Sequence, residues 1–331
     1  MKGIILSGMR PTGRLHIGHL SVLENWVNLQ QDYESYFTVA DWHALTTGFD
    51  ATNQIRQNIK EMVLDWLAAG INPEKSPIFI QSQVKQHAEL HLLLSMITPL
   101  PWLERCPTYK DQINQMGKQG KDIMTYGFLG YPLLQAADIL AYQATAVPVG
   151  EDQLPHLEMA REIARRFNFL FETKIMSEPQ ALLAKFPSVP GTDGRKMSKS
   201  YNNFISMSAE EKELKKLVNA MVTDPARIHK TDKGNPKAAG CIVYKYHEIY
   251  NQENAPEIEQ ACMQANIGCG ECKKACLAKL EEIISPIRER RAVFAAQAGL
   301  VEDILADGGK RARVRAEATM EQVRAAMKID F

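Results

Sequence analysis

The chain has 331 residues, of which 45% are hydrophobic and 24% charged, a composition that excludes intrinsic disorder and suits about two globular domains. Its 39 basic and 39 acidic residues give a formal charge of zero, which argues against non-specific nucleic-acid binding but allows a local basic surface. The opening MKGIILSGMR is too short an apolar run for a signal peptide, and Pro99 and Pro101 break the most apolar later stretch. We therefore expect a cytoplasmic protein without a membrane span.

Short runs with strand propensity alternate with longer runs of helical periodicity in the first part of the chain. We predict strands at 4–7, 36–40, 78–81 and 146–149, and helices at 20–31, 54–69, 133–142 and 153–168. Gly70 is a stop signal for the second of these helices. This alternation predicts an α/β fold with a Rossmann-like parallel sheet and crossover helices.

The pattern changes after about residue 205, where strand signals become scarce. The predicted helices there cover residues 210–221, 257–265, 271–284, 286–298 and 310–327. The sequence therefore predicts two domains, an α/β domain at 1–205 and a mostly helical domain at 206–331.

The stretch PTGRLHIGHL, residues 11–20, lies where the first strand gives way to a helix. Open α/β sheets bind nucleotides beyond the carboxyl ends of their strands, but neither common glycine-rich phosphate loop is present. Gly13 and Gly18 leave room for a ring or ribose to approach the backbone. His16 and His19 can donate ring N–H groups to phosphate oxygens beside a helix N-terminus. Alone, this tetrapeptide HIGH is equally compatible with two surface histidines on a turn.

A second segment, GTDGRKMSKS, ends in the pentapeptide Lys196-Met197-Ser198-Lys199-Ser200. HIGH followed by KMSKS resembles the paired signatures of class I aminoacyl-tRNA synthetases. A loop that follows Gly191 and Gly194 can close on a polyphosphate. Lys196 and Lys199 would then neutralise the charge that gathers on departing pyrophosphate.

Between the two signatures, YPLLQAADILAYQATAVPVGEDQ carries Asp138 within an apolar helix. A buried carboxylate needs hydrogen-bond donors, which come either from the protein itself or from a ligand. The segments AADIL and GEDQ, with SGMRPTG, DWHALT and TYK in the same order, resemble the bacterial tryptophanyl-tRNA synthetases over essentially the whole chain. The resemblance implies that Asp138 accepts a hydrogen bond from the indole N–H of tryptophan.

The same resemblance implies roles for further residues. Tyr131 and Gln153 would hold the substrate ammonium, and His43 and Gln135 would line the pocket. The residues implied to surround ATP are Arg10, Pro11, Thr12, Gly18, His19, Gly150, Glu151, Asp152, Lys196, Met197, Ser198, Lys199 and Ser200. Arg10, His19 and Gln135 depart from the residues common in the family, which affects the detail of the contacts and not the reaction.

The implied reaction is the activation of L-tryptophan by ATP with Mg²⁺ and transfer of the aminoacyl group to the 3′ end of tRNA(Trp). His16 and His19 would contact phosphate oxygens in the transition state, and Lys196 and Lys199 the leaving pyrophosphate. A tyrosyl-tRNA synthetase of the same fold is the alternative, and a non-catalytic RNA- or nucleotide-binding regulator is a third. The resemblance also implies a homodimer and a tRNA anticodon-binding role for residues 206–331.

Five of the six cysteines fall between residues 241 and 276. Cys241, Cys262, Cys269 and Cys272 have the spacing C-x20-C-x6-C-x2-C, which in a reducing compartment points to metal before disulfide. A subset of tryptophanyl enzymes resembles this region and binds a 4Fe–4S cluster, so we expect an iron–sulfur cluster, with zinc as the alternative. Cys276, one helical turn after Cys272, is expected to be a spare cysteine, and Cys106 is expected to be a packing residue.

Two basic runs, RERR at 288–291 and KRARVR at 310–315, lie in the last fifth of the chain. Solvated helix faces are the first interpretation of such runs, and contact with tRNA phosphates is the second.

Overall fold

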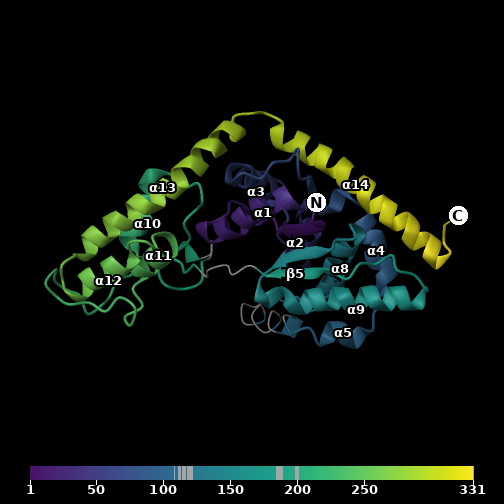
Figure 1. Ribbon diagram of the computed structural model, residues 1–331, viewed down its shortest axis with the longest axis horizontal. Coiled ribbons are helices and arrows are strands. Elements are labelled where there is room, and N and C mark those ends of the chain that lie inside the picture. Colours follow the sequence, from purple (N-terminus) through teal and green to yellow (C-terminus); the bar gives the residue numbers. More distant parts are fainter. Residues whose placement is uncertain are drawn as a thin grey trace.

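The computed structural model describes residues 1–107, 109–110, 113, 117, 122–183, 189–197 and 201–330. Within them, five parallel strands form one sheet in the order β3-β2-β1-β4-β5 (Figure 1). The strands are β1 (Ile4–Met9), β2 (Glu34–Val39), β3 (Ile78–Ile80), β4 (Ala146–Val149) and β5 (Gln180–Leu183). The predicted parallel sheet is confirmed, and β5, a half-exposed edge strand, is the one strand that the sequence pattern missed.

Helices connect the strands and cover both faces of the sheet. They are α1 (Leu20–Asp32), α2 (Asp41–Gly48), α3 (Ile55–Ala69), α4 (Gln86–Ser95), α5 (Leu100–Glu104), α7 (Tyr126–Leu129), α8 (Tyr131–Ala141) and α9 (Leu154–Leu170). Short 3₁₀ helices are η1 (Ile17–His19), η2 (Gln81–Gln83) and η3 (Glu151–Gln153). Gly70 ends α3 with a φ of 110°, a left-handed conformation that confirms the predicted stop signal.

Alternate residues of the strands point into two separate cores, as the period-2 geometry of a strand requires. Phe37 and Val39 of β2 pack in the cluster that contains α1 and α3, whereas Tyr36 packs in the cluster that contains α8 and α9. The sheet is therefore covered on both faces, as parallel sheets generally are. In Figure 1, α9 lies in front of the sheet and α1 and α3 lie above it.

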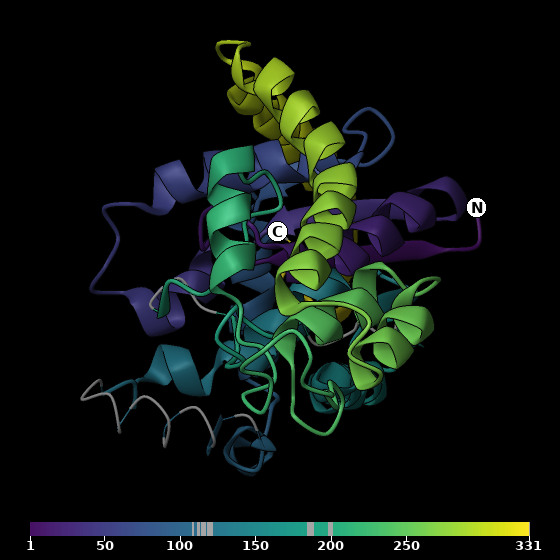
Figure 2. The same cartoon turned by 90° about the vertical axis from the view of Figure 1, so that its left-hand side faces the viewer.

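After residue 205 the described chain is helical. The helices are α10 (Glu211–Ala220), α11 (Ile242–Tyr250), α12 (Ala255–Met263), α13 (Cys269–Ala295) and α14 (Leu300–Met327). Figure 2, seen from the left-hand side of Figure 1, shows α10 alongside α13. The predicted mostly helical region is confirmed, although the sequence pattern did not predict α11. None of these or the other described helices combines the length and apolarity needed to cross a membrane.

The predicted helix boundary at Pro286 is wrong, because α13 continues through this proline. Ile284 and Ile287, on either side of it, are both buried, so tertiary packing of the helix outweighs the loss of one backbone hydrogen bond. A single helix of 27 residues, about 40 Å long at 1.5 Å per residue, therefore runs from the cysteine cluster to the α/β part of the chain.

The last helix, α14, packs against the sheet and not against α10–α12 (Figure 1). Gly308 packs directly on the edge strand: a Cβ atom at this position would lie 2.0 Å from the carbonyl oxygen of Ile78. Ala312, Ala316 and Met320 of the same helix join the core around α8 and α9. The boundary between two domains at residue 205 stays a prediction.

The arginines of the two basic runs bind the protein itself, although Arg290, Lys310 and Arg313 are also exposed, so contact with tRNA phosphates stays a prediction. Arg290 donates to the carbonyl of Ala68 at 2.7 Å, and Arg311 and Arg315 donate to carbonyls that precede β3 and β4. Arg291 forms a buried ion pair with Asp65 at 2.7 Å. The runs therefore dock α13 and α14 onto the α/β part of the chain.

Candidate active site

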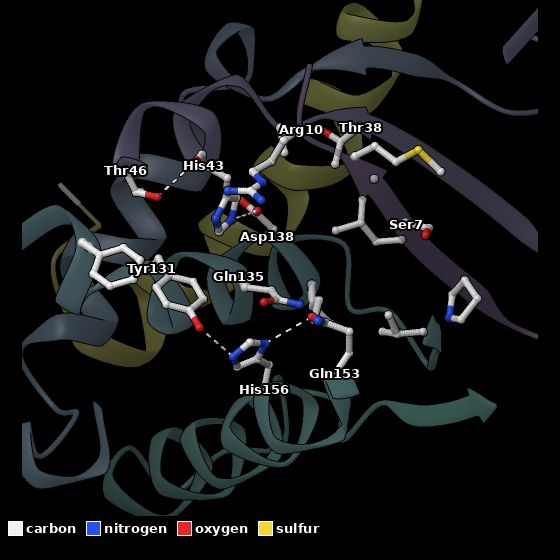
Figure 3. Close-up of a pocket in the computed structure, with 18 residues that line it drawn as sticks. Ser7, Arg10, Thr38, His43, Thr46, Tyr131, Gln135, Asp138, Gln153 and His156 are labelled. Carbon is white, nitrogen blue, oxygen red and sulfur yellow. Dashed lines mark hydrogen bonds and ion pairs between the residues drawn. The ribbon is translucent and has the colours of Figure 1, made fainter. Parts of the chain in front are cut away.

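A cavity opens at the carboxyl ends of β1, β2 and β4 (Figure 3). Between β1 and β4 the order of the strands reverses, which is the position where open α/β sheets bind their ligands. The residues that line the cavity include five predicted for the tryptophan site and one predicted for ATP: His43, Tyr131, Gln135, Asp138, Gln153 and Arg10. Residues from β1, α2, α8 and η3 are thus brought together as the resemblance implied.

Asp138 lies on α8 at the wall of this cavity and is 4% exposed. Its Oδ2 lies 2.9 Å from Nε2 of His43, and its Oδ1 lies 2.6 Å from Nδ1 of His87. Nε2 of Gln81 donates to both oxygens, at 2.8 and 2.9 Å. The protein itself therefore supplies three donor groups to the carboxylate before any ligand binds.

These donors keep Asp138 ionised. Burial alone would raise the pKa of Asp138, but the neighbouring His87 and the hydrogen bonds from His43 and His87 outweigh it and hold the pKa below its usual value. The cavity wall consequently carries an ionised carboxylate at neutral pH.

Gln81 and His87 form a second layer behind Asp138 that the sequence analysis missed. The backbone N–H groups of Trp42 and His43 donate to Oε1 of Gln81, which turns its amide N–H₂ toward Asp138. Nε2 of His87 lies 2.8 Å from the hydroxyl of Tyr142, so the imidazole bridges Asp138 and Tyr142. Gln81 and His87 both follow β3, and polar residues after the carboxyl end of a strand are the sequence signal that could have identified them as site residues.

Tyr131 and Gln153 meet through a third residue, His156, which was also missed. Nε2 of His156 lies 2.9 Å from the Tyr131 hydroxyl, and its Nδ1 lies 3.2 Å from Oε1 of Gln153 (Figure 3). Because an amide oxygen only accepts, Nδ1 carries the proton and Nε2 accepts from the phenol. Gln135 lies between this group and Asp138.

The first signature forms η1 and the residues before it. His16 caps η1 by accepting from the N–H of Gly18, and the rings of His16 and His19 lie 3.9 Å apart. A Cβ on Gly18 would lie 2.9 Å from the His16 ring, so the space beside this glycine is filled by the imidazole. Pro11 is buried and Thr12 exposed in the preceding loop. Gly13 has a φ of 89°, so the turn requires its conformational freedom.

The predicted ribose contacts, Gly150, Glu151 and Asp152, follow directly after β4. Glu151 and Asp152 are exposed at the start of η3. A Cβ on Gly150 would lie 2.7 Å from Oδ1 of Asp152, so the Asp152 side chain occupies the space beside this glycine. The segment stands at the same edge of the sheet as the cavity.

The second signature is described as far as Met197. Lys196 is exposed, whereas Met197 is buried in the core that it shares with the late helices. Pro190 and Lys196 face each other in an antiparallel bridge, so the segment that leads into the signature is a tight hairpin. Ser198, Lys199 and Ser200 lie outside the described residues.

The four predicted cysteine ligands line a second cavity, among the late helices. Arg227 lies against them and donates to Sγ of Cys262 at 3.3 Å. Burial, together with the neighbouring thiols, raises the pKa of Cys272 to about 12. Among the described residues, no group of three or more His, Cys, Asp and Glu side chains is arranged to hold a metal ion. Cys106 is buried, as expected of a packing residue, and Cys276 is also buried.

Residues 2–285 match the family of class I tRNA synthetases for tryptophan and tyrosine. The tryptophan–tRNA ligase of Thermotoga maritima is 50% identical over 331 residues, 99% of each chain. That of Aquifex aeolicus is 43% identical and covers 98% of this chain and 99% of its own. The chain belongs to the tryptophan–tRNA ligases.

Solved structures of tryptophan–tRNA ligases share the whole fold. The enzyme from Campylobacter jejuni complexed with ADP and tryptophan has a TM-score of 0.84 and 31% identity, over 98% of this chain and 99% of its own. A tyrosyl-tRNA synthetase from Archaeoglobus fulgidus has a TM-score of 0.65 and 20% identity, which shows only a common fold. The tyrosine alternative is therefore not favoured.

Replacing Gln81 with Glu tests the second layer of this ligase site. The substitution puts a carboxylate against Asp138, and the repulsion between two like charges disturbs the acceptor that faces the cavity. We expect the KM for tryptophan to rise about tenfold in amino-acid-dependent ATP–pyrophosphate exchange. Gln83→Glu, on the exposed side of the same turn, is the matched control. An equal effect in both variants, or none in either, would contradict the assigned role of Gln81.

Proposed function

We propose that Asp138 reads the indole N–H of tryptophan in the cavity at the carboxyl ends of β1, β2 and β4. The observation that carries the proposal is the state of its carboxylate, which is buried, ionised and already bound by three donor groups. A carboxylate has about four acceptor sites and the protein already fills four, so the indole N–H would replace one donor, for which His43 is placed because it also lines the cavity. A phenylalanine ring has no N–H to replace that donor, and the site discriminates against it on that ground.

The amino-acid end of the substrate is assigned to Tyr131 and Gln153. His156 joins both side chains, and a phenol oxygen and an amide oxygen are acceptors of the kind that suits an ammonium group. His43 and Gln135 complete the walls of the pocket. This arrangement orients the substrate carboxylate toward the edge of the sheet where the first signature lies.

ATP with Mg²⁺ is the second substrate. We assign its phosphates to His16, His19, Lys196 and Lys199, and its remaining contacts to the loop at 10–12, Gly18 and the segments 150–152 and 196–200. The tryptophan carboxylate attacks the α-phosphorus, a P–O bond forms, and the bond to pyrophosphate breaks. The chain needs no nucleophile of its own, so it acts by positioning and by neutralising charge. A hydroxyl at the 3′ end of tRNA(Trp) then displaces AMP from the adenylate.

Measuring ATP–pyrophosphate exchange with each of the twenty amino acids tests this assignment directly. We expect exchange with tryptophan and no more than about a thousandth of that kcat/KM with tyrosine or phenylalanine. Exchange with tyrosine at a comparable rate would favour the tyrosyl alternative. Absence of exchange with every amino acid would favour a non-catalytic regulator.

We propose further that Cys241, Cys262, Cys269 and Cys272 hold a 4Fe–4S cluster. Four thiols, one from the N-cap of α11, one from α12 and two from the first turn of α13, surround one cavity, and its lining contains no imidazole. Such a soft ligand set suits iron–sulfur or zinc. Arg227 also suits a bound group of negative charge, because it already donates to Cys262. When bound, the cluster would tie the starts of α11 and α13 together.

The metal content of the protein tests this second proposal. We expect an anaerobic preparation to be brown and to contain about four iron atoms per chain, and Cys269→Ser to lose the colour and the iron. Cys276→Ser, one turn further along α13, is the matched control and is expected to keep both. Stoichiometric zinc without iron in the anaerobic protein would favour the zinc alternative, and the absence of both metals would contradict a metal site.

We also propose that the chain acts as a homodimer in the cytoplasm and that the helical region at residues 206–331 recognises the anticodon of tRNA(Trp). Support for a dimer comes from large apolar side chains that are exposed close together on α4 and α5: Leu92, Met96 and Leu100. Support for the role in tRNA binding is the resemblance of the chain to the family.

A further inference from the structure

Helix α11 contacts both signature segments with side chains from one face. Tyr246 and Tyr250 are four residues apart, so they lie one above the other on the helix, and their ring centroids are 5.9 Å apart. The Tyr250 hydroxyl donates to the carbonyl of Ile17 at 3.1 Å, and the Tyr246 hydroxyl donates to the carbonyl of Pro190 at 2.8 Å. Segments about 170 residues apart are thus joined to one helical turn.

The Ile17 contact belongs to a set of backbone bonds that fix the first signature. The N–H of Ile17 donates to Ile205 at 2.9 Å, and the N–H of Met207 donates to Leu15 at 3.1 Å. With Tyr250 on the carbonyl of Ile17, the backbone on both sides of His16 is bound by residues from the second half of the chain. The position of His16 and His19 therefore depends on this later part of the structure.

The Pro190 contact lies at the base of the second signature. Pro190 pairs with Lys196, and the N–H of Gly191 donates to the carbonyl of Arg195 at 2.7 Å. The bond from Tyr246 to Pro190 therefore also restrains the position of the paired residue, Lys196. Tyr246 is 1% exposed, so water does not compete for its hydroxyl.

We propose that Tyr246 and Tyr250 are positioning residues that set the distance between the two ATP-binding segments. The inference rests on the proposed assignment of ATP to these segments and extends it to a helix that has no contact with the substrate cavity. Because burial raises the pKa of both phenols, their hydroxyls stay protonated and donate throughout the working pH range. The cavity assigned to tryptophan is lined by residues of α2 and α8 and by none of α11, so the two tyrosines are not expected to affect tryptophan binding.

Removing each hydroxyl tests the proposal without leaving a cavity. In ATP–pyrophosphate exchange, we expect Tyr246→Phe and Tyr250→Phe each to lower kcat/KM for ATP about three- to tenfold, which is the effect of losing one neutral hydrogen bond. We expect the double variant to lose more than either single variant. The KM for tryptophan is expected to change less than about twofold in all three.

Tyr244→Phe is the matched control. Tyr244 also lies on α11, but its hydroxyl donates to Glu259 of α12 at 3.0 Å and contacts neither signature segment. We expect its ATP kinetics to match those of the unsubstituted protein. Kinetic parameters of Tyr246→Phe and Tyr250→Phe equal to those of Tyr244→Phe would overturn the inference, as would a parallel loss for ATP and tryptophan. If the unsubstituted protein exchanged with no amino acid, the proposed function would fail instead.

Discussion

The burial of one negative charge organises the substrate cavity. An aspartate without partners in an apolar helix would be costly and would take up a proton. In this chain three side chains from α2, η2 and α4 donate to Asp138, and the resulting cluster joins those elements to α8. The charge is thereby kept at the cavity wall, beside the space assigned to the ligand. The stability of this region and its specificity depend on the same hydrogen bonds.

A second organising feature is the dependence of the ATP segments on the late helices. The first signature is held by residues 205, 207 and 250, and the second begins in a hairpin whose base is held by Tyr246. The helix that carries both tyrosines begins next to Cys241, one of the four thiols proposed to hold a cluster. Contacts of this kind connect a region proposed to bind tRNA with the segments proposed to bind ATP.

Local pattern was enough to predict the parallel sheet, because strand propensity, helical periodicity and the stop at Gly70 are written in neighbouring residues. Local pattern did not predict that α13 continues through Pro286, because packing on both sides of the proline outweighs its local preference. It also did not predict that α14 packs on the sheet, because this contact depends on the fit between Gly308 and β3. Asp138 stood out as a carboxylate in an apolar helix. Gln81 and His156 did not, because their roles come from partners that the fold brings together.

The most direct test of the role of Asp138 uses the unsubstituted protein and a changed ligand. An analogue of tryptophan with sulfur in place of the indole N–H keeps the shape of the ring system but has no proton to donate. If Asp138 accepts that proton, kcat/KM for the analogue in ATP–pyrophosphate exchange falls about a hundredfold or more below that for tryptophan. A value within about threefold of that for tryptophan would show that the carboxylate does not recognise the ring.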